Sequence, residues 1–371
     1  MSKRILHIIP TLDPHGSEKQ LTLLASHLPR DRFDVHVCAL TRGGPFEESL
    51  AKADIPVTVL HKRWKVDPGA WWRLKRHIAR LRPDLVHTWL FAANCYGRTA
   101  ARQAGVRRLA ASERCVDRWK MWHELAIDRR LAASTDRIVA NSSAVRDFYV
   151  SRGIAADKFV VIANGIPPAE QGAEPRSPGH ADLLAELNLP AGLRLIATVG
   201  RLSPQKRVKE LIWGMHQLSK LFDNVYLLVI GDGPLRSALE RYARLTGVED
   251  RVRFLGTRLD VARLMAHAEV FWLASGYEGQ SNAIMEAMAA GVPVVACDIP
   301  ANRELVVPGQ TGFLVRPSSR NAFARHTLPI LEDAELARRF GAAGRARMLS
   351  EFTVERMVER HAALYGELLD C

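Results

Sequence analysis

The chain has 371 residues, of which 47% are hydrophobic and 25% charged, an ordinary globular composition at about twice the length of one typical domain. Its formal net charge of +12 predicts an anionic partner, but the charge alone does not choose among nucleic acid, a phosphate-bearing substrate and a membrane surface. The chain has no apolar run of the roughly 18 residues that span a membrane, no signal-like start and no zinc-type cysteine spacing. We therefore expect a cytoplasmic protein, soluble or peripheral.

The first part of the chain alternates short β-branched runs with segments of helix length. Helical segments include 71–82 and 119–134. The predicted strands cover residues 4–9, 33–40, 55–60, 85–90, 107–112, 137–142 and 159–164. Strands that alternate with helices predict a parallel, doubly wound sheet.

Residues 167–192 are rich in Pro, Gly, Ala and Glu and interrupt this alternation, so we place a linker there, between domains at 1–166 and 193–352. The alternation then resumes, with predicted strands at 194–200, 224–231, 251–256, 268–275, 292–297 and 311–317. The sequence thus predicts an α/β protein of two Rossmann-like domains whose strand ends face a cleft. Apolar periodicity after Phe352 predicts that 353–371 form a helix that crosses back to the N-terminal domain.

The most informative motif is 269–297, EVFWLASGYEGQSNAIMEAMAAGVPVVAC. A hydrophobic strand ends there in a glycine-containing loop, and a helix begins near Ser281. Glu278 precedes this helix and Glu286 lies within it, so both carboxylates can face one cleft, although this spacing alone also arises by chance. An anion is favoured by the helix dipole and by the amides at the helix N-terminus, those of Gly279, Gln280, Ser281 and Asn282.

A second motif is the polar loop of 199–210, VGRLSPQKRVKE, which leaves a strand at Gly200. Arg201 and Lys206 project from this loop. Two fixed cations at a strand exit can neutralise a diphosphate as it becomes a leaving group. The alternative interpretation is a solvated basic turn.

Three further glycine-containing turns are weaker candidates. Gly16, between the first strand and first helix, can bring its amide to a phosphate, with Glu18 capping the helix, and an ordinary turn is equally compatible. Gly231 lies in a GDG segment that has the same two interpretations. The loop that follows Gly256 is suited to holding a nucleobase through main-chain contacts and apolar packing, and it contains Thr257, Arg258 and Leu259.

Taken together, these motifs resemble glycosyltransferase family 4, a large class of retaining enzymes with the GT-B fold. The resemblance rests on VGRLSPQK, GDGPL, FLG, EGQSNAIMEAMAAGVPVVA and GFLV, with VIANGI and the N-terminal strand, loop and helix. It implies a hexosyltransferase-type enzyme of cell-surface polysaccharide or glycolipid synthesis. Such an enzyme moves a sugar from a nucleoside diphosphate sugar to a saccharide or lipid-linked acceptor, and in this family UDP donors are favoured, with GDP donors second.

The resemblance also assigns roles. Arg201 and Lys206 would grip the donor pyrophosphate, Glu278 would contact the transferred sugar and Glu286 would bind the ribose diol. No Asp-x-Asp occurs in the sequence, so the usual divalent-metal clamp has no obvious ligands, and we expect the cation pair to replace the metal, with no cofactor beyond the donor. By the same resemblance, substitution proceeds at the front face of the sugar, with the leaving phosphate helping to deprotonate the acceptor.

The sequence departs from the family at two places on the acceptor side. The family's usual Gly-Gly pair in the first loop is His15-Gly16 here, and its cleft histidine is replaced by Glu113 and Arg114. His87, at the end of a predicted strand, is expected to face the cleft, with a packing role as the alternative.

The basic segment 61–82 carries three tryptophans among eight Lys or Arg residues and one acid, a pattern that suits an anionic membrane on the inner face of the plasma membrane, and RWKMW at 118–122 is similar. A solvated basic helix is the alternative. The rival functions are a GT-B epimerase or phosphorylase, and a basic nucleic-acid-binding protein. No nucleic-acid recognition motif is present, so we expect no nucleic-acid partner.

Overall fold

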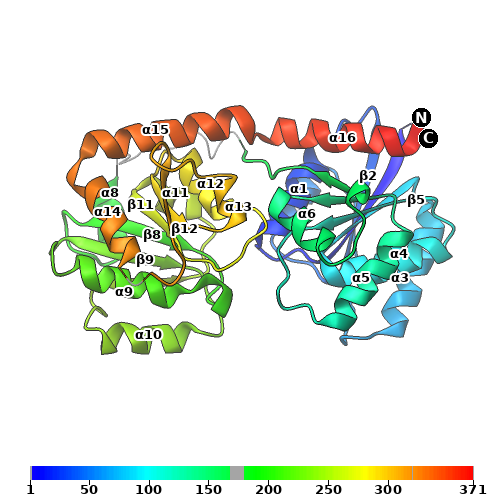
Figure 1. Cartoon of the computed structure of the whole chain (residues 1–371). Coiled ribbons are helices and arrows are strands. Elements are labelled where there is room, and N and C mark those ends of the chain that lie inside the picture. The colour runs from blue at the N-terminus through cyan, green and yellow to red at the C-terminus, as the bar shows by residue number, and fades with distance from the viewer. Residues whose placement is uncertain (1, 168–178, 320, 371) are drawn as a thin grey trace. The chain divides into compact units, whose positions relative to one another are not determined.

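The computed structural model describes residues 2–167, 179–319 and 321–370 (Figure 1). The chain divides into two compact units. The first unit comprises the chain up to Gly165 together with the segment from Val354 onward, and the second unit runs from Ile166 to Thr353. Each unit is built on one parallel sheet, which confirms the predicted fold class.

The first unit contains a seven-stranded sheet in the order β3-β2-β1-β4-β5-β6-β7. Its strands are β1 (Lys3–Thr11), β2 (Phe33–Arg42), β3 (Val57–Val59), β4 (Leu85–Trp89), β5 (Arg108–Glu113), β6 (Arg137–Ala140) and β7 (Phe159–Val161). Ile5 of β1 lies opposite Val35 of β2 on one side and Leu85 of β4 on the other. The strand order therefore reverses between β1 and β4, which makes this pair the topological switch point where ligands bind in open α/β sheets.

Helices cover both faces of this sheet because successive residues of each buried strand point to opposite faces. Ile5 and Ile9 pack with α1 and α16, whereas Leu6 and Ile8 pack with α3 and α4. The helices are α1 (Gly16–His27), α2 (Phe46–Lys52), α3 (Pro68–Leu81), α4 (Leu90–Gln103), α5 (Trp122–Ala133), α6 (Ser143–Val150) and α16 (Val354–Asp370). Helix α5 begins at Trp122 instead of the predicted 119, because residues 117–121 form a loop after β5.

Helix α16 completes the core of the first unit through aromatic and imidazole rings. Tyr365 is fully buried, and its hydroxyl lies 2.6 Å from Nδ1 of His87 in β4. The ring of His361 stacks on that of Trp89, whose indole N–H donates to Nδ1 of His7 at 3.1 Å. Neutral imidazoles suit this role, since each can donate and accept one hydrogen bond without carrying a buried charge.

The second unit contains a six-stranded sheet in the order β10-β9-β8-β11-β12-β13. Its strands are β8 (Arg194–Val199), β9 (Val225–Ile230), β10 (Val252–Gly256), β11 (Ala268–Leu273), β12 (Val294–Cys297) and β13 (Gly312–Val315). Strand β8 pairs in parallel with both β9 and β11. The switch point of this sheet therefore lies between β8 and β11.

The helices of the second unit include one inside the predicted linker. They are α8 (His180–Glu186), α9 (Val208–Leu218), α10 (Arg236–Leu245), α11 (Val261–Ala266), α12 (Asn282–Ala289), α13 (Pro300–Arg303), α14 (Ala322–Glu332) and α15 (Ala334–Glu351). Leu183 and Leu184 of α8 pack against Leu195 and Leu228, so the expectation that 167–192 is all linker is wrong for α8. Residues 168–178 of that stretch lie outside the described part of the chain. Within the described ranges, no helix combines the length and apolarity needed to cross a membrane.

Acid should destabilise the first unit through its buried histidines. Burial, assisted by repulsion from His361, lowers the pKa of His7 to about 3, and burial lowers that of His361 to about 3. The pKa of His87 is lowered well below its ordinary value for the same reason. The folded state therefore stays neutral at pH values where the unfolded chain binds protons. Stability is fully present above about pH 6.5 and falls as pH decreases, by roughly 1.4 kcal/mol per pH unit for each histidine.

Urea unfolding between about pH 7 and about pH 5 measures this dependence. We expect His361→Gln to weaken the pH dependence by the share of one histidine, and replacement of the exposed His27 by Gln to leave it unchanged. Equal pH dependence in His361→Gln and the unmodified chain would contradict this assignment.

Candidate active site

The loop that follows β8 carries Lys206 on a short, tightly turned segment. Pro204–Lys206 form a single 3-10 turn, and Arg207 then adopts a left-handed conformation with φ 51° before α9 begins. A left-handed non-glycine residue is strained and is usually held by its surroundings at a functional site. Here the turn directs Lys206 back over the strand end, where a Cβ added to Gly200 would lie 3.0 Å from Cε of Lys206.

Lys206 and Glu278 form an ion pair, with Nζ 2.6 Å from Oε1. Glu278 is 8% exposed and the lysine side chain 18%, so the pair is screened only partly by solvent. The pairing follows from topology, since the loops after β8 and β11 leave adjacent parallel strands at the same edge of the sheet. The ammonium group has three N–H donors, and its bond to Glu278 uses one of them.

Backbone hydrogen bonds and one amide side chain join these two loops. The N–H of Gly276 donates to the carbonyl of Gln205 at 2.9 Å, and the Gln205 side-chain amide donates to the carbonyl of Tyr277 at 2.8 Å. Gln205 and Gly276 were missed by the sequence analysis. The signal that could have found them is the strand order, because pairing of β8 with β11 brings their following loops together.

Glycines allow the backbones to approach closely beside Lys206. A Cβ on Gly231 would lie 2.2 Å from the carbonyl oxygen of Gly200, and a Cβ on Gly233 would lie 2.6 Å from that of Leu202. Hydrogen bonds at 2.9 Å hold the two segments together, from Gly200 N–H to Ile230 and from Leu202 N–H to Asp232. A narrow crevice, without room for a water molecule, lies beside this contact. It is lined by Thr198, Val199, Gly200, Leu202, Lys206, Val208, Val229, Ile230 and Leu273.

Helix α12 begins at the same edge of the sheet. The helix start near Ser281 was predicted from the sequence; Ser281 is the N-cap, and its hydroxyl accepts from the amide of Ile284 at 3.4 Å. Asn282 is the first helical residue, so its amide belongs to the N-terminal turn, whereas Gly279 and Gln280 lie in the loop just before the cap. Glu286 lies one turn beyond Asn282 and is half-buried.

The remaining candidates of the second unit differ in how far their side chains are engaged. Arg201 is exposed, and within the described chain no neighbour hydrogen-bonds or pairs with it. Arg258 is held by Asp260 and by Glu186 of α8, at 2.7 and 3.2 Å, so its guanidinium braces α8. The flanking Thr257 and Leu259 are exposed, which leaves their main chain and the leucine side chain for contact with a ligand. Among the described residues, no group of His, Cys, Asp or Glu is arranged to hold a metal ion.

In the first unit, Gly16 and His15 lie at the switch point after β1. His15 is the N-cap of α1 without a side-chain cap bond, and Gly16 is the first helical residue. Glu18 is 4% exposed and accepts from the Thr11 hydroxyl at 3.3 Å. Burial raises the pKa of Glu18.

The expectation that His87 faces a cleft is wrong. Its ring is fully buried beneath α16, with Nδ1 at the Tyr365 hydroxyl and Nε2 2.9 Å from Oγ of Ser112. Both ring nitrogens are therefore occupied within the core. The packing alternative holds for this histidine.

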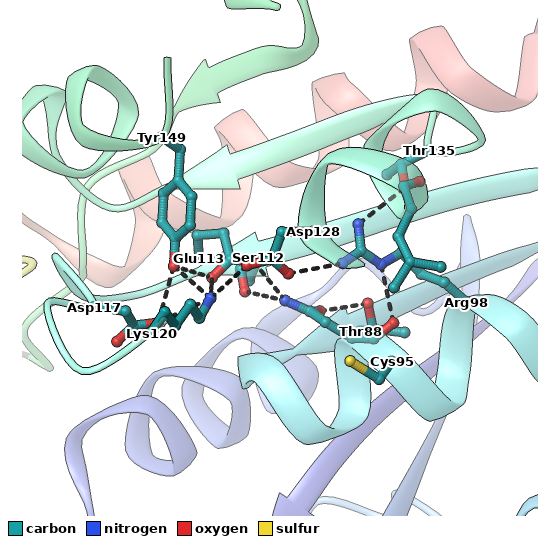
Figure 2. A network of polar contacts seen from close by, with 12 residues as sticks. Thr88, Cys95, Arg98, Ser112, Glu113, Asp117, Lys120, Asp128, Thr135 and Tyr149 are labelled. Carbon is teal, nitrogen blue, oxygen red and sulfur yellow. Dashed lines mark hydrogen bonds and ion pairs between the residues drawn. The ribbon is translucent and has the colours of Figure 1, made fainter. Parts of the chain in front are cut away.

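Glu113 and Arg114 do not present free side chains to an acceptor either. Arg114 is 6% exposed, lies over the Trp89 ring and hydrogen-bonds Asn164. Glu113 belongs to a buried polar network with Asn94, Tyr149 and Lys120 (Figure 2). Burial raises the pKa of Glu113. This network was not predicted from the sequence, because its members come from separate elements of the first unit.

Two sequence families match the chain over almost its whole length. The family described as "Glycosyltransferase Family 4" matches residues 14–170, and "Glycosyl transferases group 1" matches residues 181–347. The chain belongs to the group 1 glycosyltransferases of family 4. The resemblance inferred from the motifs and the glycosyltransferase activity class are thereby confirmed.

Two relatives and one solved structure of another protein agree with that membership. N-acetyl-alpha-D-glucosaminyl L-malate synthase of Bacillus anthracis is 27% identical over 187 residues, 50% of this chain and 49% of that protein. UDP-Gal:alpha-D-GlcNAc-diphosphoundecaprenol alpha-1,3-galactosyltransferase of Escherichia coli is 24% identical over 365 residues, 92% and 91% of the two chains. The crystal structure of Anabaena Alr3699/HepE in complex with UDP and glucose has a TM-score of 0.88 at 25% identity, covering 99% of this chain and 100% of that one.

The close contact of Gly231 with Gly200 should be intolerant of a side chain. Gly231 has φ 129°, and the Cβ of Gly231→Ala would also meet the Gly200 carbonyl. Gly247 is the matched control, because it has φ 67° but nothing within 4 Å of an added Cβ. Gly247→Ala carries the cost of a left-handed residue, roughly 1–2 kcal/mol, and Gly231→Ala should lose a further 1–3 kcal/mol or so, because φ 129° lies outside the left-handed region and the added Cβ clashes. Urea unfolding measures both variants, and equal losses would contradict the proposed steric constraint.

Proposed function

We propose that this glycosyltransferase uses a nucleoside diphosphate sugar as donor and retains the configuration of the transferred sugar. The observation that carries the proposal is the Lys206–Glu278 pair where β8 and β11 end, with the N-terminus of α12 at the same sheet edge. An ammonium group and the amides of a helix N-terminus both bind anions, so this sheet edge suits a diphosphate. The Anabaena Alr3699/HepE structures in complex with UDP and with UDP-glucose support a UDP-sugar, and a GDP-sugar is the second candidate.

The donor-binding residues have separate tasks in this proposal. Arg201 and the two remaining N–H donors of Lys206 bind the pyrophosphate, and Gly200, Gly231 and the α12 amides surround it. Glu278 accepts from a hydroxyl of the transferred sugar. Glu286 accepts from the ribose hydroxyls, and the main chain of Thr257–Leu259 contacts the base.

The transfer step follows from where charge develops. The bond between the anomeric carbon and the phosphate oxygen breaks, and its electron pair leaves with the diphosphate. The acceptor hydroxyl attacks the same face of the sugar, and its proton passes to the departing phosphate oxygen. Arg201 and Lys206 stabilise the negative charge that grows on the diphosphate, while the Glu278 carboxylate stabilises positive charge on the sugar. We propose that these two cations make a divalent metal unnecessary.

Loss of either cation should lower turnover more than donor binding. We expect Arg201→Ala and Lys206→Ala each to reduce kcat on the order of a hundredfold, the scale for removing one preorganised charge stabiliser. Arg244→Ala, which removes an exposed cation from α10, is the control and should leave kcat unchanged. Steady-state kinetics with UDP-glucose, and with GDP-mannose as the second donor, measure these effects. Near-normal kcat in both site variants would refute the cation-pair mechanism.

The metal requirement can be tested on the unmodified enzyme. We expect full activity in the presence of EDTA and a product with the donor's anomeric configuration, the first measured by initial rates and the second by NMR of the product. The cation-pair proposal fails if activity is lost in EDTA and returns with added magnesium or manganese.

Glu286 should act as a binding residue. Contacts to the ribose change little between ground state and transition state, so Glu286→Ala should raise the KM for the donor at least tenfold and leave kcat within a few-fold. Titration calorimetry with UDP should show the same loss of affinity. A large fall in kcat with unchanged KM would contradict the ribose assignment.

We also propose that the acceptor is a saccharide or a lipid-linked saccharide of cell-surface polysaccharide or glycolipid synthesis. The Escherichia coli relative named for a diphosphoundecaprenol acceptor supports this class. A lipid-linked acceptor requires the enzyme to reach a membrane surface, and the basic segment 61–82 is suited to that contact. Trp64 and Trp72 are 66% and 57% exposed there, and Arg63, Lys65, Arg73, Arg76 and Arg80 are exposed around them.

A further inference from the structure

Large apolar side chains of the first unit are exposed in a second place besides the basic segment. Residues 117–122 comprise the loop after β5 and the first residue of α5, and within them Trp119 is 53%, Met121 60% and Trp122 76% exposed. We call these residues the tryptophan loop. Exposed tryptophans gathered in a short segment indicate an interaction surface, because burying each ring against a partner would stabilise the complex by a few kcal/mol.

The tryptophan loop is fastened to the unit by Lys120, which points inward between the exposed residues. The lysine side chain has no exposed surface. Its Nζ lies 2.8 Å from Asp128 of α5, 2.6 Å from the hydroxyl of Tyr149 in α6 and 3.4 Å from Glu113 at the end of β5 (Figure 2). Asp117 of the loop itself is 3.1 Å away.

This arrangement keeps Lys120 charged in the interior. Burial would by itself lower the pKa of Lys120, but Glu113, Asp117 and Asp128 outweigh that effect and raise the pKa above its ordinary value. A buried charge that loses its partners is strongly destabilising, so the loop cannot withdraw Lys120 without a large loss. The buried ion pairs of Lys120 therefore fix the loop backbone, and with it the outward direction of Trp119 and Met121.

Helix α4 supports the tryptophan loop and the basic segment alike. Phe91 in its first turn packs edge-on against Trp119, with ring centroids 5.6 Å apart, and lies 4.9 Å from Nζ of Lys120. The hydroxyl of Tyr96, further along α4, accepts from the amide of Asp67 at 2.6 Å. The tryptophan loop also leaves the carboxyl end of β5, the edge at which parallel sheets bind their ligands.

Charge around the tryptophan loop complements an anionic surface. Asp117 and Asp128 are directed at Lys120, and Glu124 accepts from the Met121 amide at the start of α5. Arg118 of the loop is exposed, and so are Arg129 and Arg130, about two turns further along α5. Exposed tryptophans with arginines on the same segment suit the interface of an anionic bilayer, where the rings enter the headgroup region and the cations meet phosphate.

We propose that the tryptophan loop inserts Trp119, Met121 and Trp122 into an anionic lipid surface, and that Lys120 is the positioning residue that holds them outward. This inference goes beyond the donor chemistry and adds a second lipid contact to the basic segment. An acceptor carried on a lipid would then meet the enzyme at the edge of the first sheet.

Co-sedimentation of the full chain with vesicles tests the insertion. We expect binding to phosphatidylcholine vesicles that contain phosphatidylglycerol, and at least tenfold weaker binding after Trp119→Ser with Trp122→Ser. Leu221→Ser with Leu245→Ser is the matched control, because these leucines are 64% and 85% exposed in the second unit, and it should bind as the unmodified chain. Unchanged binding of the tryptophan variant, equal binding to neutral vesicles, or no binding of the unmodified chain would overturn the proposal.

The positioning role of Lys120 needs variants that keep both tryptophans. Lys120→Met removes the buried ammonium group and all of its ion pairs. Tyr149→Phe removes only the hydroxyl contact to Lys120 and serves as the second variant if Lys120→Met does not fold. We expect faster tryptic cleavage after Arg118 and weaker vesicle binding in each folded variant, with reduced quenching of tryptophan fluorescence by brominated lipid. A folded variant that is less stable but binds vesicles as the unmodified chain would show that Lys120 has a merely structural role.

Two further measurements separate this inference from the proposed function. Trp64→Ser with Trp72→Ser tests the basic segment alone. The thermal shift produced by UDP should be the same in the tryptophan-loop variant and the unmodified chain, because the donor residues belong to the second unit. Failure of UDP to stabilise any variant would count against the donor proposal and leave the lipid result intact.

Discussion

The parallel pairing of β8 with β11 is the constraint on which the candidate donor site depends. Two loops far apart in sequence leave these strands at the same edge, so Lys206 meets Glu278 and Gln205 meets Gly276 without any long connection. At the same edge of the sheet, the backbones of Gly200 and Gly231 approach so closely that no side chain fits at Gly231. The site is therefore a property of strand order first and of individual side chains second.

The first unit uses its charged residues differently. Glu113, Lys120 and Asp128 form a buried cluster at the carboxyl end of β5, and Arg98 approaches Asp128 from α4. Burying several charges is costly, and such clusters are retained where they fix one arrangement among several. Here the arrangement that they fix is that of the loop before α5. Electrostatic energy in this unit thus holds a surface loop in place, whereas in the second unit it pairs Lys206 with Glu278 at the candidate site.

The sequence was sufficient to predict the strands, the fold class and the family, because buried parallel strands and glycine-containing loops have strong local patterns. It also predicted that a helix begins near Ser281, and α12 begins at Asn282. It did not predict the Lys206–Glu278 pair, since their adjacency requires the strand order. His87 shows the same limit. The sequence around a histidine at a strand end is the same whether its ring faces a ligand or the tyrosine of α16. The apolar periodicity of α16 predicts a helix but not the strand against which the helix packs.

The dependence of the first sheet on α16 has a consequence for synthesis. His361 and Tyr365 close a core whose other members, His7 and Trp89, are made more than two hundred residues earlier. The second unit, from Ile166 to Thr353, leaves the ribosome complete before α16 does. Of α1 and α16, which cover the same face of the first sheet, only α1 is present until α16 arrives, so the core of the first unit is completed only after the whole second unit has been synthesised.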